Sequence, residues 1–263
     1  MTRVAGSGAR GAAALMDAAL ALAQHAGAAA LEHFRPGIAV DLKGDGSPVT
    51  VADREAERAA RAWLAGRFPD DGMLGEEFGD VNPHAPRRWI VDPVDGTRSF
   101  VRGVPLWGTL IALAEGERVI AGAACFPALG EGIAAARGCG CWWNGERCAV
   151  STVSELGEAA VMTTDERFPG RPERRAAWAR LAARAGLART WGDAYGYLLV
   201  ATGRADAMVD DRVAPWDAAP FSVIVEEAGG AFTDWKGVPT AFGGDAIATN
   251  RGLAESVRRA LAG

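Results

Sequence analysis

The sequence is poor in several features that mark common protein classes. Four cysteines in 263 residues do not suggest a disulfide scaffold, and three histidines leave few ligands for zinc. Basic residues do not exceed acidic ones, 28 against 33, so nucleic acid is not an expected partner. No apolar run reaches transmembrane length and the first residues lack a signal-peptide pattern, so we expect a cytoplasmic protein with no membrane partner.

Hydrophobic residues, by contrast, make up 49% of the chain, which is enough for a sizeable core. We expect the small and polar residues 1–12 to be disordered. Apolar residues then recur at helical spacing over Ala14–Phe34 and Thr50–Phe68, and each stretch ends just before a proline. An acidic, glycine-rich connection follows over residues 70–80. Short apolar runs between residues 89 and 144 predict an antiparallel meander.

The pattern changes after about residue 150, where predicted strands alternate with predicted helices. We therefore expect two layered halves. An N-terminal domain would cover residues 1–150 and a C-terminal domain residues 151–263, with the boundary near residues 145–155.

Carboxylates crowd the segment that leads into the meander, and only Arg87 and Arg88 oppose them. Two carboxylates about 5 Å apart repel by roughly 3 kcal/mol at an effective dielectric near 20, so several can converge only around a cation. Oxygen ligands suit Mg²⁺, Mn²⁺ or Ca²⁺ rather than zinc. The acids are Asp70, Asp71, Glu76, Glu77, Asp80, Asp92 and Asp95.

The stretch "DPVDGT" could clamp a metal ion. Asp92 ends a strand, the following proline rigidifies the turn, and Asp95 can point to the same side, with the Val94 carbonyl as a further oxygen ligand. The Gly96 and Thr97 amides can hold phosphate oxygens. A plain surface turn is the alternative, because Asp, Pro and Gly all favour turns, and the spacing alone leaves both open.

Two further acids are ambiguous in the same way. Asp217 in "PWDAAPF" lies where a helix begins and could be its N-cap, with Pro220 tolerated in the first turn. Asp53 follows Thr50 at capping-box spacing, although that motif prefers Glu or Gln.

Taken together, these motifs resemble the inositol monophosphatase superfamily of magnesium-dependent phosphomonoesterases. The stretches "DGSPVTVAD", "GEEFG", "WIVDPVDGTRSF" and "PWDAAP" occur in that order, and the resemblance covers nearly the whole chain after the first dozen residues. It implies an α+β fold, a layered αβαβα sandwich of the inositol monophosphatase and fructose-1,6-bisphosphatase type, and a homodimer.

Within the superfamily the chain is most similar to the histidinol-phosphate phosphatase branch of histidine biosynthesis. The stretches "KGDGSPVTVADREAE", "RTWGDAYGYLLVATGRADAMVD" and "VEEAGGAFTDWKG" carry this resemblance. Inositol-1-monophosphatase is the alternative, although inositol phosphatases usually carry Asn where this chain has Ser99.

The resemblance implies two to three Mg²⁺ ions at each active site. One would be held by Glu76, Asp92 and the Val94 carbonyl, and a second by Asp92, Asp95 and Asp217. A third, weaker ion would bind Glu76 mostly through water.

It also implies roles around the substrate, a small phosphate monoester. The Thr97 hydroxyl, hydrogen-bonded to Asp53, would orient the attacking water. Lys43 would lie on a mobile loop that closes over the metals, with a solvated loop lysine as the alternative. Asp193 and Asp210 would contact the organic part of the substrate, although Asp193 could instead cap a helix beginning near Ala194.

Two other classes compete with a phosphatase. A metal-dependent sensor of phosphorylated small molecules could lose members of the acid set, yet all are present. A glycosidase carboxylate pair does not explain Gly96 and Thr97 or so many acids.

Overall fold

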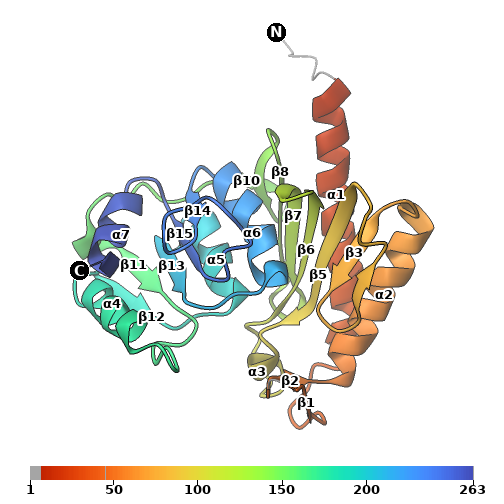
Figure 1. Ribbon diagram of the computed structural model, residues 1–263, viewed down its shortest axis with the longest axis horizontal. Coiled ribbons are helices and arrows are strands. Elements are labelled where there is room, and N and C mark those ends of the chain that lie inside the picture. The colour runs from red at the N-terminus through yellow and green to blue at the C-terminus, as the bar shows by residue number, and fades with distance from the viewer. Residues whose placement is uncertain (1–6, 45, 263) are drawn as a thin grey trace.

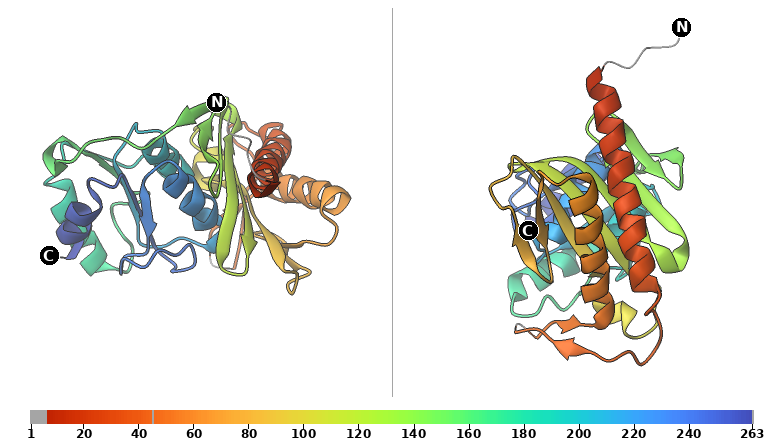
Figure 2. Two further views of the ribbon diagram at one scale, coloured as in Figure 1. Left: turned by 90° about the horizontal axis from the view of Figure 1, so that it is seen from above. Right: turned by 90° about the vertical axis from the view of Figure 1, so that its right-hand side faces the viewer.

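The computed structural model describes residues 7–44 and 46–262, which form two large β-sheets, separated and flanked by helices, and a small two-stranded sheet (Figure 1). The first sheet has the strand order β10-β9-β8-β7-β6-β5-β3-β4, and the second has the order β12-β11-β13-β15-β14. A view from above shows successive layers: α1 and α2, the first sheet, α5 and α6, the second sheet, and α4 with α7 (Figure 2). This confirms the predicted αβαβα sandwich.

The helices and strands have the following bounds. The helices are α1 (Ser7–Leu31), α2 (Val51–Arg67), α3 (Thr97–Phe100), α4 (Pro172–Ala182), α5 (Ala194–Ala201), α6 (Pro215–Glu227) and α7 (Ala254–Ala262). The first sheet contains β3 (Gly72–Gly75), β4 (Gly79–Val81), β5 (Arg87–Asp95), β6 (Gly108–Glu115), β7 (Arg118–Phe126), β8 (Glu131–Ala136), β9 (Gly140–Trp143) and β10 (Glu146–Cys148). The second contains β11 (Ala160–Met162), β12 (Leu187–Arg189), β13 (Ala207–Asp210), β14 (Ala231–Thr233) and β15 (Ala246–Thr249).

The first sheet contains the predicted meander, because β5 to β10 pair antiparallel in chain order. The connection predicted over residues 70–80 is wrong, since it forms β3, parallel to β5, and β4. The segment "KGDGSPVT" also pairs, through β1 (Asp41–Leu42) and β2 (Pro48–Val49). All four strands are too short for period-2 alternation to reveal them, and β3 and β4 also contain glycine.

Helix α1 begins at Ser7, earlier than predicted, so disorder is wrong for residues 7–12, and residues 1–6 lie outside the described chain. By length and composition alone, its Gly11–Leu31 stretch could cross a membrane, which corrects the expectation that no apolar run is long enough. Fully buried residues that include Ala19, Leu22 and Ala26 pack it on the first sheet, and 33% of the stretch is buried in this way.

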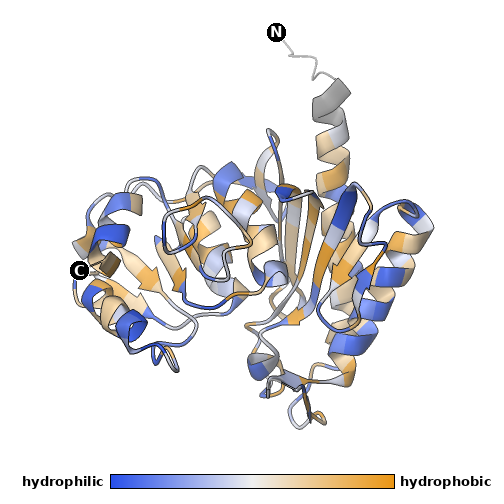
Figure 3. Cartoon of the chain, viewed as in Figure 1, coloured by the Kyte–Doolittle hydropathy of each residue, from blue (hydrophilic) through white to orange (hydrophobic). Residues whose placement is uncertain are grey.

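The core forms one layer on each side of the first sheet. Ile90 and Leu110 belong to the cluster shared with α5 and α6, whereas Trp89 and Ile111 belong to the cluster under α1 and α2, as strand alternation requires. The central strands are accordingly hydrophobic and the outer side of α2 is hydrophilic (Figure 3). A third cluster lies between the second sheet and α4 with α7.

Helix α6 packs closely on β7 and thereby brings Asp217 to the first sheet. A Cβ at Gly122 of β7 would lie 2.5 Å from the Pro220 carbonyl oxygen, so only glycine permits this approach. Pro220 lies inside the helix rather than in its first turn as predicted, because the helix already begins at Pro215.

Candidate metal and phosphate site

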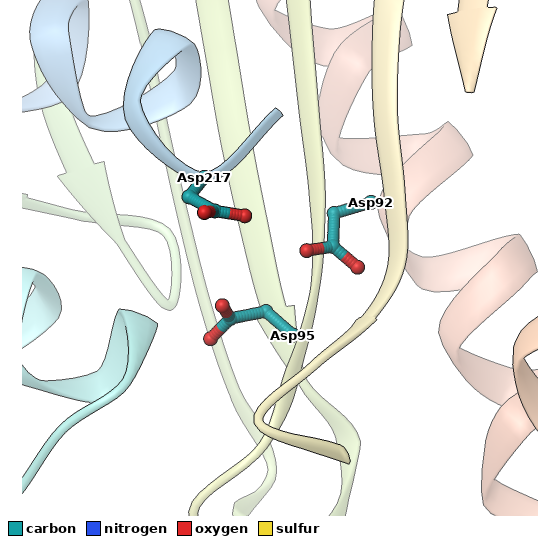
Figure 4. Close-up of side chains that lie close together, drawn as sticks. All are labelled: Asp92, Asp95 and Asp217. Carbon is teal, nitrogen blue, oxygen red and sulfur yellow. The ribbon is translucent and has the colours of Figure 1, made fainter. Parts of the chain in front are cut away.

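Three carboxylates from two distant parts of the chain meet between the first sheet and the start of α6. Asp92 and Asp95 come from the end of β5, and Asp217 comes from the first turn of α6 (Figure 4). One oxygen from each lies within 4.8 Å of the others. The pairing of β5 with β6 shifts register between Asp92 and Asp95, so the "DPVD" turn directs both acids toward α6.

Local hydrogen bonds hold these acids in place. Asp92 Oδ1 accepts from the Val94 amide at 3.0 Å, and Asp217 Oδ2 accepts from the Ala214 amide at 2.7 Å. The alternative role of Asp217 as the N-cap residue is therefore wrong. It is the third helical residue and reaches back to Ala214 at the N-cap.

The cluster is electrostatically strained without a cation. Burial, followed by the charges of Glu76, Asp95 and Asp217, raises the pKa of Asp92 well above its usual range. Burial is also the main cause that raises the pKa of Asp95 well above its usual range and that of Asp217 to about 7. Asp92 is buried and the other two are partly buried, and three mutually repelling donors that offer only oxygen fit a hard divalent cation.

Glu76 lies beside this cluster. Its amide donates to the Val91 carbonyl of β5 at 3.2 Å, and its carboxylate contributes to the raised pKa of Asp92 through charge and a hydrogen bond. Lys43 Nζ donates to Glu76 Oε1 at 2.7 Å and to Glu77 Oε1 at 2.6 Å. The solvated alternative for Lys43 is therefore wrong. Burial lowers the Lys43 pKa, but the two glutamates outweigh it and raise the pKa overall.

Thr97 and Asp53 form the other side of the site. Thr97 Oγ1 lies 3.3 Å from Asp53 Oδ1 and 3.0 Å from the Val94 carbonyl oxygen. Asp53 Oδ2 accepts from both the amide and the hydroxyl of Thr50, at 2.8 Å and 2.6 Å, so the capping box also exists. The Asp53 carboxylate thus caps the start of α2 and also holds Thr97.

Gly96 makes room for this arrangement. Its φ of 81° is in the left-handed region, and a Cβ there would lie 2.9 Å from the Leu106 carbonyl oxygen and 3.1 Å from Asp193 Oδ2. The backbone can therefore come close to Asp193 and leave the Gly96 and Thr97 amides at the start of α3.

Asp193 separates two hollows. It lines a small cavity of about 80 Å³ with Asp95, Asp210 and Asp217, and a groove of about 700 Å³ whose lining includes Arg98 and Glu166. Asp193 occupies the N-cap position of α5, but within residues 46–262 its side chain makes no capping bond. Asp95 Oδ2 instead accepts from the Ala194 amide at 2.7 Å, so the capping alternative for the Asp193 side chain is wrong.

Asp210 is buried, and hydrogen-bond donors fix the position of its carboxylate. Its Oδ1 accepts from the Thr164 amide at 2.8 Å, and its Oδ2 accepts from Tyr197 Oη at 2.9 Å. Burial raises its pKa to about 6. Asp210 lines the small cavity, and its direct contact with substrate stays a prediction.

Sequence reasoning missed Glu57, which supports the site from α2. Its carboxylate is fully buried and accepts from the amides of Glu77 at 2.6 Å and Phe78 at 3.1 Å, fixing the turn that follows Glu76. The sequence did hold a sign of this role. Glu57 is a charged residue next to Ala56 and three positions before Ala60, on the buried face of α2. The groove residues Arg98 and Glu166 carried no signal, because loops distant in sequence assemble the groove.

Comparison with known proteins gives consistent matches. The model of the inositol monophosphatase family matches residues 12–262. A histidinol-phosphatase of Chlorobaculum parvum is 43% identical and the alignment covers 88% of this chain and 90% of that protein. A histidinol-phosphatase of Mycobacterium tuberculosis is 40% identical over 92% of this chain and 96% of that protein. The structure of an inositol monophosphatase from Zymomonas mobilis superposes with a TM-score of 0.85 at 33% identity, covering 95% and 98% of the two chains.

Proposed function

Since the chain belongs to the inositol monophosphatase family of metal-dependent phosphatases, we propose that it hydrolyses histidinol phosphate to histidinol and phosphate, a step of histidine biosynthesis. Its place among phosphoric monoester hydrolases follows from that membership. The choice of substrate rests on the similarity to two histidinol-phosphatases, at 43% and 40% identity over most of the chain.

The acid cluster is the proposed metal site, with Mg²⁺ as the ion. Two to three ions would be held by Glu76, Asp92, the Val94 carbonyl, Asp95 and Asp217. When bound, such ions neutralise the phosphate dianion and lower the pKa of water. The carboxylate oxygens within 4.8 Å of one another support this assignment, because a bound cation relieves the repulsion between the ionised groups.

The chain's own groups position the reactants. Thr97 Oγ1 orients the attacking water, and Asp53 Oδ1, 3.3 Å away, accepts the hydrogen bond of that hydroxyl. The Gly96 and Thr97 amides hold phosphate oxygens. Lys43 keeps Glu76 and Glu77 together at the mouth of the site. No covalent intermediate is needed, since phosphoryl transfer depends mainly on positioning and charge stabilisation.

The substrate tail would extend from the small cavity into the groove. Histidinol phosphate carries an ammonium and an imidazole group, and Asp193 stands where the two hollows meet. Its carboxylate would accept a charge-assisted hydrogen bond from the tail. The N-terminal domain, residues 1–150, would thus supply most of the metal ligands. The C-terminal domain, residues 151–263, would supply Asp217 and the residues that determine substrate specificity. Asp210 would support Asp193 from the floor of the cavity.

Inositol-1-monophosphatase is the second candidate, favoured by the fold match with the Zymomonas mobilis enzyme at 33% identity. Its neutral polyol tail would gain no ion pair from Asp193. A non-catalytic sensor is the third, less favoured because the acid set is complete. We also propose, from the family resemblance, a homodimer in the cytoplasm.

Genetic complementation tests the proposal. In a bacterial strain that lacks its own histidinol-phosphatase, expression of this chain should restore growth without histidine. Asp92→Asn, expressed at an equal level, should not restore growth. Failure of the wild-type chain, with inositol 1-phosphate hydrolysis intact in the same extract, would favour the second candidate.

A further inference from the structure

Two cysteines outside the acid cluster face each other across the last hairpin of the first sheet. Cys141 of β9 and Cys148 of β10 are paired in register, and their Sγ atoms lie 3.4 Å apart. Directly opposite residues of antiparallel strands have Cα atoms about 4.5–5.5 Å apart, within the range of about 4.4–6.8 Å that disulfides require. A small movement of the side chains would bring the sulfurs to bonding distance.

The two thiols differ in environment in the way expected if Cys148 attacks an oxidant and Cys141 then resolves the mixed disulfide. Cys141 is fully buried, whereas Cys148 is half-buried on β10, a three-residue strand at the edge of its sheet. The hydrogen bond between the two thiols, aided by the charges of Arg204 and Arg147, lowers the pKa of Cys148 despite its burial. Cys148 is thus the more reactive and the more accessible sulfur.

A chain of hydrogen bonds joins this hairpin to the acid cluster. Trp143 Nε1 of β9 donates to Glu131 Oε2 at 2.8 Å, and Tyr195 Oη donates to Glu131 Oε1 at 2.8 Å. Tyr195 follows Ala194, whose amide donates to Asp95 at 2.7 Å. Arg204 reinforces the middle of this path through its ion pair with Glu131 and its position over the Trp143 ring.

We propose that Cys141 and Cys148 form a reversible disulfide that modulates the phosphatase site through Glu131 and Tyr195. The oxidant is a small-molecule disulfide of the glutathione class. The Cys148 thiolate attacks one of its sulfurs and releases the first small thiol, and Cys141 then attacks Cys148 and releases the second. The new protein S–S bond is balanced by reduction of the oxidant to two thiols, which take up the two protein protons.

The pair stays reduced in an ordinary cytoplasm and oxidises when the small-disulfide fraction rises. Closing the sulfurs moves β9 and β10 together, which shifts Trp143 and its hydrogen bond to Glu131. Because Tyr195 and Ala194 are consecutive in α5, a shift at Glu131 reaches the amide that holds Asp95.

The test treats the full-length, Mg²⁺-loaded enzyme with oxidised glutathione. Trypsin cleaves after Arg147 and so separates Cys148 from the peptide that carries Cys141. A Cys139→Ser variant leaves Cys141 as the one thiol of that peptide and is the matched control. The expected product is a Cys141–Cys148 cross-linked peptide pair, abolished by dithiothreitol and absent in Cys148→Ser.

Activity is measured on glycerol 2-phosphate, so that the outcome does not depend on histidinol phosphate being the substrate. We expect oxidation to lower kcat/KM by about fivefold or more, at the low end of coupling between distant sites, and dithiothreitol to restore it. Cys148→Ser should be insensitive to the oxidant, whereas Cys139→Ser should respond as wild type does. Absence of the cross-linked pair, or an equal loss of activity in Cys148→Ser, would overturn the proposal.

Discussion

Replacing Asp92 by Asn should stabilise the metal-free protein while removing its activity. The oxygens of Asp92, Asp95 and Asp217 lie within 4.8 Å of one another, and at that separation each ionised pair costs about 3 kcal/mol at an effective dielectric near 20. Asp92 takes part in two of the three pairs. Asparagine keeps the oxygen that accepts from the Val94 amide, so the local hydrogen bond survives.

Proton binding limits the gain and gives it a pH dependence. The pKa values of Asp92, Asp95 and Asp217 are raised in the folded protein, to about 7 for Asp217. The folded state therefore holds more protons than the unfolded state between about pH 4 and these raised values, so metal-free stability falls as pH rises through that window. We expect Asp92→Asn to gain about 3 kcal/mol at pH 8, or about 6–12 °C in Tm, and less at pH 5.

Differential scanning fluorimetry in EDTA at pH 5 and pH 8 measures this difference. Asp71→Asn is the matched control, because Asp71 accepts from Arg87 and Trp89 at 2.9–3.0 Å and should lose stability when its charge is removed. Mg²⁺ should raise the Tm of wild type and change that of Asp92→Asn little. An Asp92→Asn protein less stable than wild type in EDTA at pH 8 would show that repulsion among these carboxylates does not limit the stability of the metal-free protein.

Further predictions concern the metal, the substrate tail and the loop lysine. EDTA should abolish phosphate release and Mg²⁺ should restore it, whereas Ca²⁺ should inhibit because its longer, looser coordination suits an octahedral Mg²⁺ site poorly; full activity in metal-free buffer would contradict this. Asp92→Asn should lower kcat about a thousandfold, and activity within tenfold of wild type would show that the metals are misplaced. Asp193→Asn should lower kcat/KM for histidinol phosphate about ten- to a hundredfold and leave glycerol 2-phosphate nearly unchanged; equal losses would remove the specificity role. Lys43→Met should leave Glu76 and Glu77 without their shared cation and so lower metal-free Tm at pH 8, and an unchanged Tm would show that the contact contributes nothing.

Much of the fold could be predicted because its signals are local. Turn residues separate the strands of the meander, and Thr50 and Asp53 mark the start of α2. The strands β3 and β4 could not be predicted in this way, because "GMLG" becomes a strand by pairing with β5 while Glu57 anchors the turn after it. Packing outweighed local preference in the same way at Pro220, which α6 accommodates in its interior.

The acids of the candidate site could be identified from the sequence, but their positions relative to one another and their hydrogen-bond partners could not. Asp92 and Asp95 are close in sequence, so their proximity followed from one turn, whereas the meeting with Asp217 depends on how α6 packs against β7. The capping of α5 by Asp95 instead of Asp193 could not be foreseen, because it depends on contact between segments 99 positions apart. The same holds for the Lys43 ion pairs with Glu76 and Glu77.

The proposed function is that of a phosphatase suited to a cationic substrate tail. Its most direct test is the ratio of kcat/KM for histidinol phosphate to that for inositol 1-phosphate, measured with Mg²⁺ on one preparation. One charge-assisted hydrogen bond to the tail corresponds to about 1.5–3 kcal/mol, so we predict a ratio of about ten to a hundred or more. A ratio of one or below would contradict this function and identify inositol phosphate as the preferred substrate of the two.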